Sequence, residues 1–409
     1  MHEDNPSIST MADSLKSLSN HLSQTIDGYT DSSGPDGFAQ RKKIISLARQ
    51  IIDDVQDPRE KPFDYCVSMA EMGALRVLMD WRALEHIPPD GSISYAELAA
   101  KVDAEEPLLR RFAWVLVSTG VLRQIGEDRV AHTKFSPIYA NDVPQGKFFQ
   151  IMFDEGLVPY SRFPDYFKKY GRKEPLEPTH SPHGFGWGVP EKNFWEACPE
   201  QRILDVNISM QTLDQMLPVI GIYPFEWIVE NAGKVAPEAP LIVDVGGGKG
   251  QVLAQIKGKL PELPAERLVL QDREPTIKDA EENRPPVLEG AKFMVHDFFQ
   301  PQPVKGALVY FLRRVMHDWS DKYNAQILGH CRDAMTPQSR ILIMDQVMPN
   351  PPTTLPCQTD ICMMNLGAKE RTVKDWHALV DLAGLDLVKI WQIPSTEVSV
   401  IECKKRAEA

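Results

Sequence analysis

The sequence predicts an α/β protein with two different halves, one mainly α-helical and one built around a parallel sheet. In the N-terminal half, apolar residues recur at intervals of three and four, the period of an amphipathic helix. From residue 240 onwards, short apolar runs of strand length alternate with helical segments, as in sheets whose parallel strands are joined by helices. The 409 residues allow two or three domains, with a core that needs neither disulfides nor metal ions.

Composition and charge exclude several classes of protein. With 43% hydrophobic and 25% charged residues, the chain has the composition of an ordinary globular protein. Its net charge of −12 disfavours nucleic acid as a partner, because a protein that binds the phosphate backbone needs a positive surface. The longest strongly apolar stretch, Phe112 to Leu122, is too short to span a membrane, and the polar N-terminus lacks a signal-peptide pattern. We therefore expect a cytoplasmic protein, with no membrane partner, whose six scattered cysteines are reduced thiols.

Residues 41–140 predict helices followed by a hairpin. Ser94 and Glu97 form the capping box of one helix, and Gly120 ends the next. A hairpin then turns at residues 126–128. Helix, helix and hairpin in this order form a winged-helix outline.

A winged helix suggests DNA binding, but the second helix does not support it. Only Arg110 and Arg111 at its start are basic, and the helix continues as the almost wholly apolar FAWVLVSTG. We therefore expect this domain to pack against another surface or to dimerise.

Two regions flank this domain. The first 40 residues are rich in Ser, Asp and Gly and predict a mobile arm with one short helix. Residues 141–239 predict a helical linker that contributes to the substrate pocket. This linker contains HSPH, which includes His180 and His183. We interpret HSPH as a loop, because no further ligands follow at metal-binding spacing.

Residues 240–409 predict the sheet, with helices on both of its faces. The predicted strands are LIVDV at 241–245, RLVL at 267–270, AKFMV at 291–295, GALVYFL at 306–312 and SRILIM at 339–344. The segments LDLVKIW and EVSVIEC predict a terminal hairpin.

The glycine-rich turn after the first of these strands carries the sharpest local signal. Residues 244–250, DVGGGKG, let the backbone turn tightly and approach a ligand, and the helix that follows offers free N–H groups. The spacing is GxGxG rather than the GxGxxG of NAD-binding proteins, because Gln251 stands at the last glycine position. Asp272 and Asp297 end the next two strands, at the sheet edge where ligands of such folds bind. Together these features predict a nucleotide-like cofactor.

Six motifs resemble, in order and spacing, those of the S-adenosylmethionine-dependent O-methyltransferases of the plant caffeate type and their fungal secondary-metabolite relatives. The motifs are LIVDVGGGKG, LQDREP, HDFF, FLRRVMHDWSD, ILIMDQVMP and GAKERT. The similarity extends from about Met72 to the C-terminus, and HDWSD and GAKERT are far more specific than the glycine turn. It implies a Rossmann-like class I methyltransferase sheet at residues 240–409, a winged-helix-like dimerisation domain at residues 41–140, a homodimer, and S-adenosyl-L-methionine as cofactor.

The resemblance also implies which residues bind the cofactor. They are Gly246, Gly248, Asp272, Arg273, Asp297, Phe298 and Arg313. In this interpretation the two glycines cradle the methionine end, Asp272 holds the ribose, and Asp297 with the phenylalanine after it flanks the adenine. Arg313 keeps the positive charge of the lysine that relatives usually have. His296 replaces a glycine common before the equivalent of Asp297.

Methyl transfer to a phenol requires removal of a proton, and a histidine with a pKa near 6.5 is a suitable general base. His317 in HDWSD lies just beyond a predicted strand. In relatives the equivalent histidine is the base, and two acidic residues steer its ring. By position these are Asp345, one methylene shorter than the usual glutamate, and Glu370. Asp318 is an alternative partner of Asp345, and we expect Trp319 to have a packing role.

The expected acceptor is a phenolic hydroxyl of an aromatic or polyketide-type secondary metabolite. By alignment, the residues that line its pocket are Leu204, Ile208, Ile361 and Asn365. An apolar pocket with a few polar groups suits such a flat molecule. No metal is expected, because the match is not to the short, magnesium-dependent catechol type.

Two other functions stay open from the sequence. One is a methyltransferase-fold enzyme that binds S-adenosylmethionine but catalyses a dehydration or a pericyclic rearrangement. The other is a winged-helix regulator that senses a small molecule through its α/β half.

Overall fold

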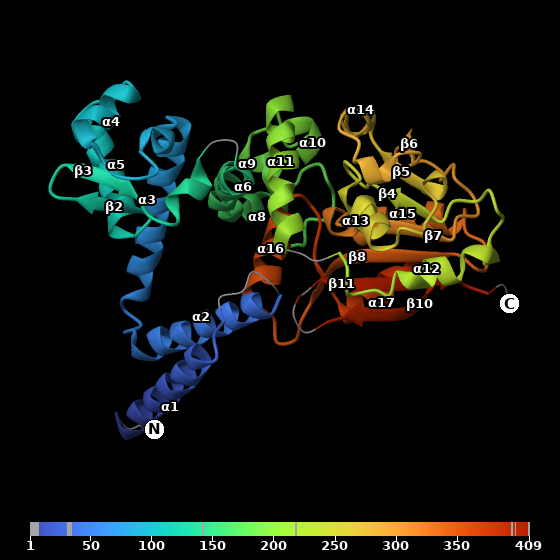
Figure 1. The fold of residues 1–409 in the computed structure, drawn as a ribbon, viewed down its shortest axis with the longest axis horizontal. Helices are drawn as coiled ribbons and strands as arrows, with labels where there is room; N and C mark the ends of the chain where they lie inside the picture. Colours follow the sequence, from blue (N-terminus) through green and yellow to red (C-terminus); the bar gives the residue numbers. More distant parts are fainter. Residues whose placement is uncertain are drawn as a thin grey trace. The chain divides into compact units, whose positions relative to one another are not determined.

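The computed structural model describes residues 8–30, 35–140, 143–216, 219–393, 396 and 398–407. The chain divides into two compact units, an N-terminal unit of residues 1–140 and a C-terminal unit of residues 141–409 (Figure 1). In the described part of the chain, no helix is both long and apolar enough to cross a membrane.

The N-terminal unit is helical, with one small sheet. Its elements are α1 (Ile8–Asp27), α2 (Pro35–Val55), α3 (Lys61–Asp80), η1 (Ala83–His86), β1 (Ile93–Ser94), α4 (Tyr95–Lys101), α5 (Glu106–Ser118), β2 (Leu122–Ile125), β3 (Arg129–His132) and η2 (Ser136–Tyr139). The helix expected in the first 40 residues is not short: α1 has 20 residues, and α2 crosses the expected boundary at residue 40. The expected arm therefore contains long helices, and α1 and α2 contact each other through Ser14 and Asp54. Residues 1–7 and 31–34 of that arm lie outside the described residues.

The predicted helix, helix and hairpin are present in that order. Ser94 caps α4 and shares a complete capping box with Glu97, as the sequence predicts. Gly120, at φ +81°, follows α5, and β2 and β3 form the predicted hairpin. The short strand β1 adds to the hairpin, so the sheet has the order β1-β3-β2.

The C-terminal unit begins with a helical segment. Its elements are α6 (Pro144–Ile151), the π-helical turn η3 (Met152–Leu157), α7 (Val158–Ser161), α8 (Phe163–Tyr170), α9 (Pro182–Gly186), α10 (Phe194–Ala197), α11 (Glu200–Met216), α12 (Glu226–Glu230) and η4 (Ala232–Lys234). Within this unit, α11 packs along α6.

The main sheet follows, and the predicted strands and the terminal hairpin are confirmed. The strands are β4 (Ile242–Val245), β5 (Leu268–Asp272), β6 (Lys292–Val295), β7 (Val309–Arg313), β8 (Arg340–Met348), β9 (Arg371–Thr372), β10 (Leu385–Gln392) and β11 (Val398–Lys405). The helices between them are α13 (Gln251–Lys259), η5 (Ala265–Arg267), α14 (Glu274–Glu282), η6 (Pro286–Leu288), η7 (Met316–Asp318), α15 (Asp321–Arg332), α16 (Thr354–Asn365) and α17 (Val373–Leu382).

The strand order is β10-β11-β8-β7-β4-β5-β6, with β9 paired to β8. Strands β4 to β8 are parallel, and β11 and β10 are antiparallel additions. The chain starts at the central strand β4 and reaches β5 on one side and β7 on the other. A crevice for a ligand is expected at the carboxyl end of β4, where the strand order reverses.

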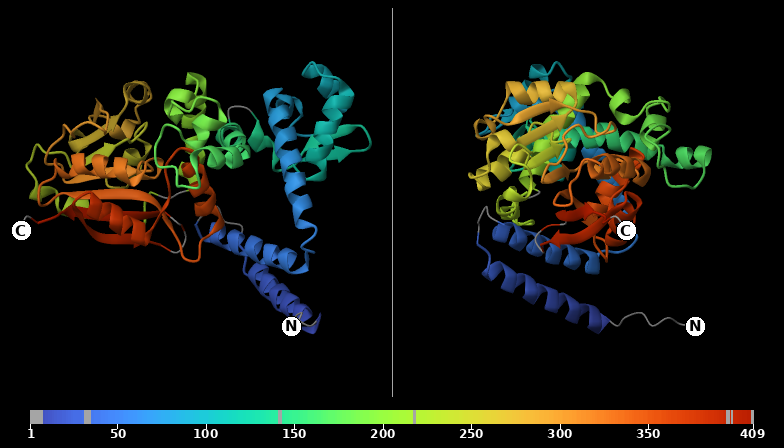
Figure 2. Two further views of the ribbon diagram at one scale, coloured as in Figure 1. Left: turned by 180° about the vertical axis from the view of Figure 1, so that it is seen from behind. Right: turned by 90° about the vertical axis from the view of Figure 1, so that its right-hand side faces the viewer.

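Helices cover both faces of this sheet (Figure 2). Alternate residues of each strand point to opposite faces, so neighbours such as Ile242 and Val243 enter different cores. One core includes residues of α12, α13 and α14, and the other includes residues of α15 and α17. The central strands are buried on both faces, which explains their nearly continuous apolar sequences.

Candidate active site

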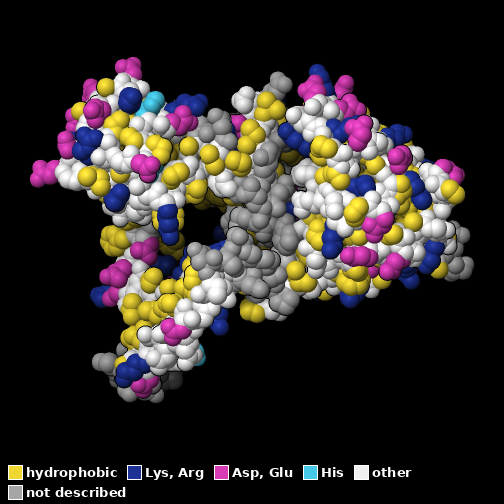
Figure 3. Space-filling model, viewed as in Figure 1, with side chains coloured by type: hydrophobic (Ala, Val, Ile, Leu, Met, Phe, Trp, Pro, Cys, Tyr) yellow, Lys and Arg dark blue, Asp and Glu magenta, His cyan; other side chains and the backbone are white. Residues whose placement is uncertain are grey.

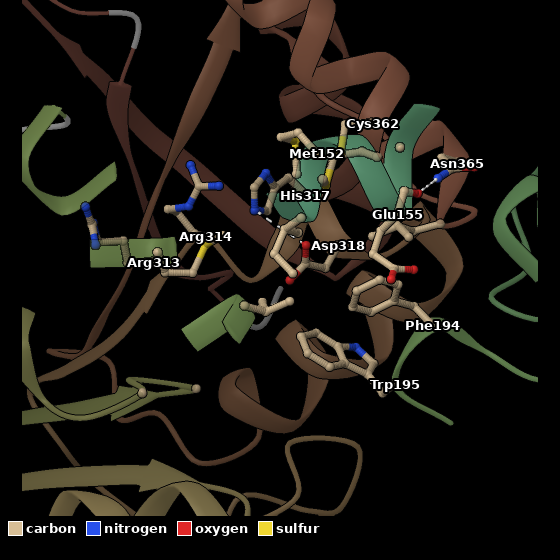
Figure 4. Close-up of a pocket in the computed structure, with 18 of the residues that line it drawn as sticks. Met152, Glu155, Phe194, Trp195, Arg313, Arg314, His317, Asp318, Cys362 and Asn365 are labelled. Carbon is tan, nitrogen blue, oxygen red and sulfur yellow. Dashed lines mark hydrogen bonds and ion pairs between the residues drawn. The ribbon is translucent and has the colours of Figure 1, made fainter. Parts of the chain in front are cut away.

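A cavity of about 260 Å³ lies at the carboxyl ends of β4 and β7, within the C-terminal unit (Figure 4). The glycine turn after β4 and the segment from Arg313 to Asp318 form one side of it. The opposite side consists of η3, α10, α11 and the end of α16. The cavity therefore combines the predicted cofactor turn with the histidine of HDWSD.

The glycine turn has a backbone that side chains would not permit. Gly246 and Gly248 have φ values of +71° and +60°. A Cβ on Gly247 would lie 2.5 Å from a carboxylate oxygen of Asp244. The N–H of Gly248 donates to Oδ2 of Asp272 over 2.9 Å, and this hydrogen bond joins the glycine turn to the end of β5.

Asp244 is a site residue that the sequence-based set omitted. Its side chain is 1% exposed, and neither carboxylate oxygen has a hydrogen-bond partner among the described residues. Burial raises the pKa of Asp244 to about 7, opposed by the charge of Arg313. A buried acid without a partner, in a cavity wall, fits a ligand that brings a cation. Its place directly before the glycines was a signal that could have found it.

The other predicted cofactor residues lie at the same edge of the sheet. Arg313 lines the cavity, and Phe298 lies beside Gly246, where a Cβ would be 3.6 Å from its ring. The guanidinium of Arg273 lies 5.1 Å from the ring centre of Trp195. Asp297 accepts a hydrogen bond from the N–H of Phe299 over 3.0 Å, in the turn after β6.

His317 lies in η7, buried at the cavity wall, with an acid at each ring nitrogen. Its Nδ1 is 2.9 Å from Oε1 of Glu370, and its Nε2 is 3.5 Å from Oδ1 of Asp318. The short contact indicates that Nδ1 carries the hydrogen and donates it to Glu370. Nε2 then has a free lone pair.

Asp345 does not make the contact that the sequence led us to expect. It is buried near His317 and acts on its charge, but neither of its carboxylate oxygens has a hydrogen-bond partner among the described residues. Of the two acids that the sequence assigns to the ring, Glu370 accepts the hydrogen bond from Nδ1, whereas Asp345 acts on His317 only through its charge.

Burial shifts the pKa values of His317 and of the acids around it. Loss of hydration lowers the pKa of His317, although Asp318 and Asp345 oppose this. The same cause raises the pKa of Glu370 to about 7 and that of Asp345 to about 6. His317 is therefore neutral at neutral pH, the form that can accept a proton.

Arg371 of GAKERT fixes the HDWSD segment in place. Its side chain is fully buried and donates to the carbonyl oxygens of Met316 and Trp319, each over 2.9 Å. It also pairs with Asp321 over 2.7 Å. Trp319 packs against Phe299 with ring centres 4.8 Å apart. The two motifs are thus parts of one rigid element around His317.

Of the four predicted acceptor residues, which all lie in the described part of the chain, only Asn365 lines the cavity. Leu204 and Ile361 are 48% and 42% exposed, and Ile208 is partly buried. Leu204, Ile208 and Ile361 lie on the predicted helices but do not line this cavity. Two residues along a helix turn a side chain by roughly 200°. The lining residues are Val206 and Met210 of α11 and Cys362 and Met363 of α16.

Sequence reasoning also missed the wall opposite His317. Glu155, Phe194 and Trp195 lie together on that side, while Arg314 lies beside His317 (Figure 4). Arg314 has a φ of +54°, rare for a residue with a side chain. Arg314 belongs to the motif FLRRVMHDWSD but was given no role there, whereas Glu155, Phe194 and Trp195 lie in the segment 141–239 and belong to no recognised motif.

HSPH is not the open loop that the sequence indicated. His183 lies in α9, is 1% exposed, and its Nε2 is 2.8 Å from Oε2 of Glu155. His180 precedes α9 and pairs with Glu191 over 3.0 Å. The two histidines therefore have separate partners.

Comparisons with known proteins agree with these features. A family model of the O-methyltransferase domain matches residues 234–386. The methyltransferase cfoD of Aspergillus candidus is 37% identical over 96% of this chain and 98% of its own. The chain belongs to the S-adenosylmethionine-dependent O-methyltransferases.

Solved structures place this O-methyltransferase among enzymes of the same fold. OxaC in complex with S-adenosylhomocysteine (SAH) and oxaline is 25% identical with a TM-score of 0.86, over 97% of this chain and all of that one. A structure described as a pericyclic reaction enzyme is 24% identical with a TM-score of 0.83, over 97% of this chain and all of that one. The second likeness shows the fold alone. The predicted Rossmann-like class I methyltransferase fold is confirmed.

The cofactor of this O-methyltransferase is S-adenosylmethionine, as the motifs predict. Two observations fit it. The unpartnered carboxylate of Asp244 matches the ammonium group of its methionine part, and the glycine turn leaves room that a Cβ would fill.

Proposed function

We propose that this enzyme methylates a phenolic hydroxyl of an aromatic or polyketide-type secondary metabolite, with His317 as the general base. The observation that carries the proposal is the pair formed by His317 and Glu370 in the wall of the cavity that also contains the glycine turn. A neutral imidazole with an unprotonated Nε2 can remove the proton of an acceptor hydroxyl that binds beside it.

The cofactor is held by the predicted residues together with Asp244. In this proposal Asp244 pairs with the ammonium group, and Gly246 and Gly248 allow close approach of the methionine part. Asp272 accepts hydrogen bonds from the ribose, and Arg273, Asp297, Phe298 and Arg313 complete the site. When bound, the cofactor supplies a methyl group on a positively charged sulfur.

The chain's own residues prepare the acceptor. Nε2 of His317 takes the hydroxyl proton, which increases the negative charge on the acceptor oxygen. Glu370 keeps the imidazole in the correct tautomer and stabilises the imidazolium that forms. Asp345 adds negative charge without a direct contact, and Asp318 is positioned to hold the acceptor beside Nε2. The cavity needs no metal for this proton transfer, and we expect a chelator to leave the rate unchanged.

A His317→Ala variant tests the base. We expect methyl transfer to fall by about 10²- to 10⁴-fold, the usual contribution of a general base, while S-adenosylmethionine binds within about threefold of wild type. His377→Ala, at an exposed histidine of α17, is the matched control and should behave as wild type. A His317→Ala rate within about threefold of wild type removes His317 as base.

We also propose a role for each region of the chain. Residues 141–239 form one wall of the cavity together with the end of α16, and other residues of 240–409 form the opposite wall, as the lining residues support. We assign residues 41–140 to dimerisation. In α3, Phe63 is 70% and Met69 64% exposed, and Tyr65 and Val67 are also exposed. Figure 3 shows hydrophobic side chains along this helix. A helix whose first half exposes these apolar side chains needs a partner, and a second copy of the chain supplies the same surface.

A further inference from the structure

A second polar group faces the cavity, away from His317, and neither the glycine turn nor the HDWSD motif accounts for it. Glu155 lies in the π-helical turn η3 and lines the cavity, although its side chain is only 9% exposed. Figure 4 shows its carboxylate close to Phe194, on the side opposite Arg314. Burial of a carboxylate in a mostly apolar wall costs free energy, so we expect this carboxylate to bind a polar partner.

Other residues hold both the side chain and the backbone of Glu155 in place. Its Oε2 is 2.8 Å from Nε2 of His183, and its Oε1 is 3.3 Å from Nε of Arg202. The backbone carbonyl of Glu155 accepts a hydrogen bond from the side-chain amide of Asn365 over 2.9 Å. That carbonyl partner also fixes the amide orientation of Asn365. The side chain and the backbone are therefore both anchored.

The group retains capacity for a further partner. Arg202 also pairs with Asp154, so two carboxylates share one guanidinium. A carboxylate offers about four acceptor positions, and the contacts with His183, Arg202 and the thiol of Cys198 use three of them. The wall at Glu155 therefore attracts a hydrogen-bond donor.

The cluster of Glu155, His183 and Cys198 contains residue types that bind metal ions. The potential ligand atoms of Glu155, His183 and Cys198 lie within 4.8 Å of one another. However, the guanidinium of Arg202 occupies the other oxygen of the same carboxylate, and burial raises the pKa of the Cys198 thiol to about 12. A positive charge beside a protonated thiol is unfavourable for a divalent cation. The contacts are those of a hydrogen-bonded cluster.

We propose that Glu155, positioned by His183 and Arg202, is a specificity-determining residue that binds a second hydroxyl or an N–H group of the methyl acceptor. The inference rests on the proposed function in one respect, namely that this cavity receives the acceptor. Phe194 and Trp195 beside Glu155 then contact the flat part of the molecule, while the hydroxyl to be methylated lies at His317. A simple phenol leaves the remaining acceptor position of this carboxylate unused, whereas a second hydroxyl or N–H group fills it and gains a hydrogen bond to a charged acceptor.

Binding to the enzyme saturated with S-adenosylhomocysteine tests this, because no methyl transfer is needed. The probes are 1-naphthol and its 1,3-, 1,6- and 2,7-dihydroxy counterparts, titrated by calorimetry. We expect at least one diol to bind wild type about tenfold or more tightly than 1-naphthol, as a hydrogen bond to a charged acceptor allows. That preference should be largely lost in Glu155→Leu and partly kept in Glu155→Gln, which retains an acceptor oxygen.

Two controls separate this role from a structural one. Asp154→Asn changes the neighbouring carboxylate, which shares Arg202 but does not line the cavity, and should keep the preference. Affinity for 1-naphthol should stay within about twofold in every variant, since that probe needs no second acceptor. The inference is overturned if wild type prefers none of the diols, or if the preference survives in Glu155→Leu. Methylation without such a preference leaves the proposed function standing, whereas the preference without methylation leaves only the inference.

Discussion

At the scale of single residues, the two ring nitrogens of His317 have different surroundings. Glu370 accepts a hydrogen bond from Nδ1, and Nε2 is left for the acceptor beside Asp318. Burial lowers the pKa of the imidazole and raises those of the acids around it. These groups titrate as a coupled set, so the acid limb of a rate profile belongs to the pair of His317 and Glu370.

The pH dependence follows from these directions. As the pH falls through about 7, Glu370 gains a proton and stops stabilising the imidazolium, and the neutral imidazole is lost at lower pH. We expect kcat/KM of wild type to fall on the acid side near this range. Glu370→Gln should lower the maximal rate and move the acid limb to lower pH, because the variant has no carboxylate to protonate and a weaker pull on the His317 proton. An acid limb that stays in place or moves upward contradicts this assignment.

Asp244 gives a prediction about stability. Its pKa in the folded chain, about 7, lies above the ordinary value of 3.8. The stability it contributes is therefore fully present below pH 3.8 and is lost as the pH rises to about 7. Without cofactor, Asp244→Asn should exceed wild type in unfolding free energy by a few kcal/mol at pH 8, and by less at pH 4.5.

The same Asp244→Asn variant should bind S-adenosylmethionine at least about tenfold more weakly, because an amide cannot pair with the ammonium group. Chemical denaturation and calorimetry measure the two effects. Wild type being the more stable protein at pH 8, or unchanged cofactor affinity in the variant, would speak against the role of Asp244.

At the scale of elements, Arg371 and Gly367 explain why GAKERT has its sequence. Arg371 ties η7 to the start of α15, and Gly367 has a φ of +84° with its Cα against another chain segment. A Cβ at Gly367 would lie 2.2 Å from the carbonyl oxygen of Glu177. The loop before Glu370 can therefore take its path only with glycine here.

Gly367→Ala tests this against a matched control. Gly188 has a similar positive φ of +73°, but a Cβ there would meet nothing within 4 Å. Gly188→Ala should cost about 1 kcal/mol of unfolding free energy from backbone strain alone. Gly367→Ala should cost clearly more, about 3 kcal/mol, and should also lower activity through His317. Equal losses in denaturant titrations of the two variants would show that the contact with Glu177 is unimportant.

The elements also show what a sequence can predict. The strands β4, β5, β7 and β8 have apolar runs buried on both faces, so their positions follow from composition and length. The glycine turn, His317 and Glu370 belong to motifs with fixed spacing. The residues that line the opposite wall of the cavity belong to no such motif. Whether Leu204 or Val206 faces the cavity depends on the rotation of α11 about its own axis. The sequence also does not show that Asp345 lies near His317 without a hydrogen bond to it.

At the scale of the whole molecule, the chain has one unit that carries the chemistry and one that we assign to association. The segment 141–239 could not be divided into walls and loops from its sequence, because its short helices are set by contacts such as that between His183 and Glu155. The helix content of the first 40 residues was underestimated, because their polar composition resembles that of an unfolded arm.

The dimer is open to a direct test. We expect wild type to sediment as a dimer at micromolar concentration. The double substitution Phe63→Glu and Met69→Glu, at two exposed apolar positions of α3, should shift it toward monomer without loss of helical content. Leu382→Glu, at a side chain that is 61% exposed in α17, is the control and should remain dimeric. A wild-type monomer, or a dimer that is indifferent to both changes in α3, contradicts the assignment.

The destination of the methyl group tests the central claim most directly. The enzyme is incubated with S-adenosylmethionine carrying a trideuterated methyl group and with a panel of phenols, including naphthalene diols. Products are followed by mass spectrometry and their labelled position by NMR. The account predicts a product labelled on a phenolic oxygen, formed by wild type and not by His317→Ala. An acceptor converted without the label while the cofactor stays intact, or one labelled equally by the variant, would contradict it.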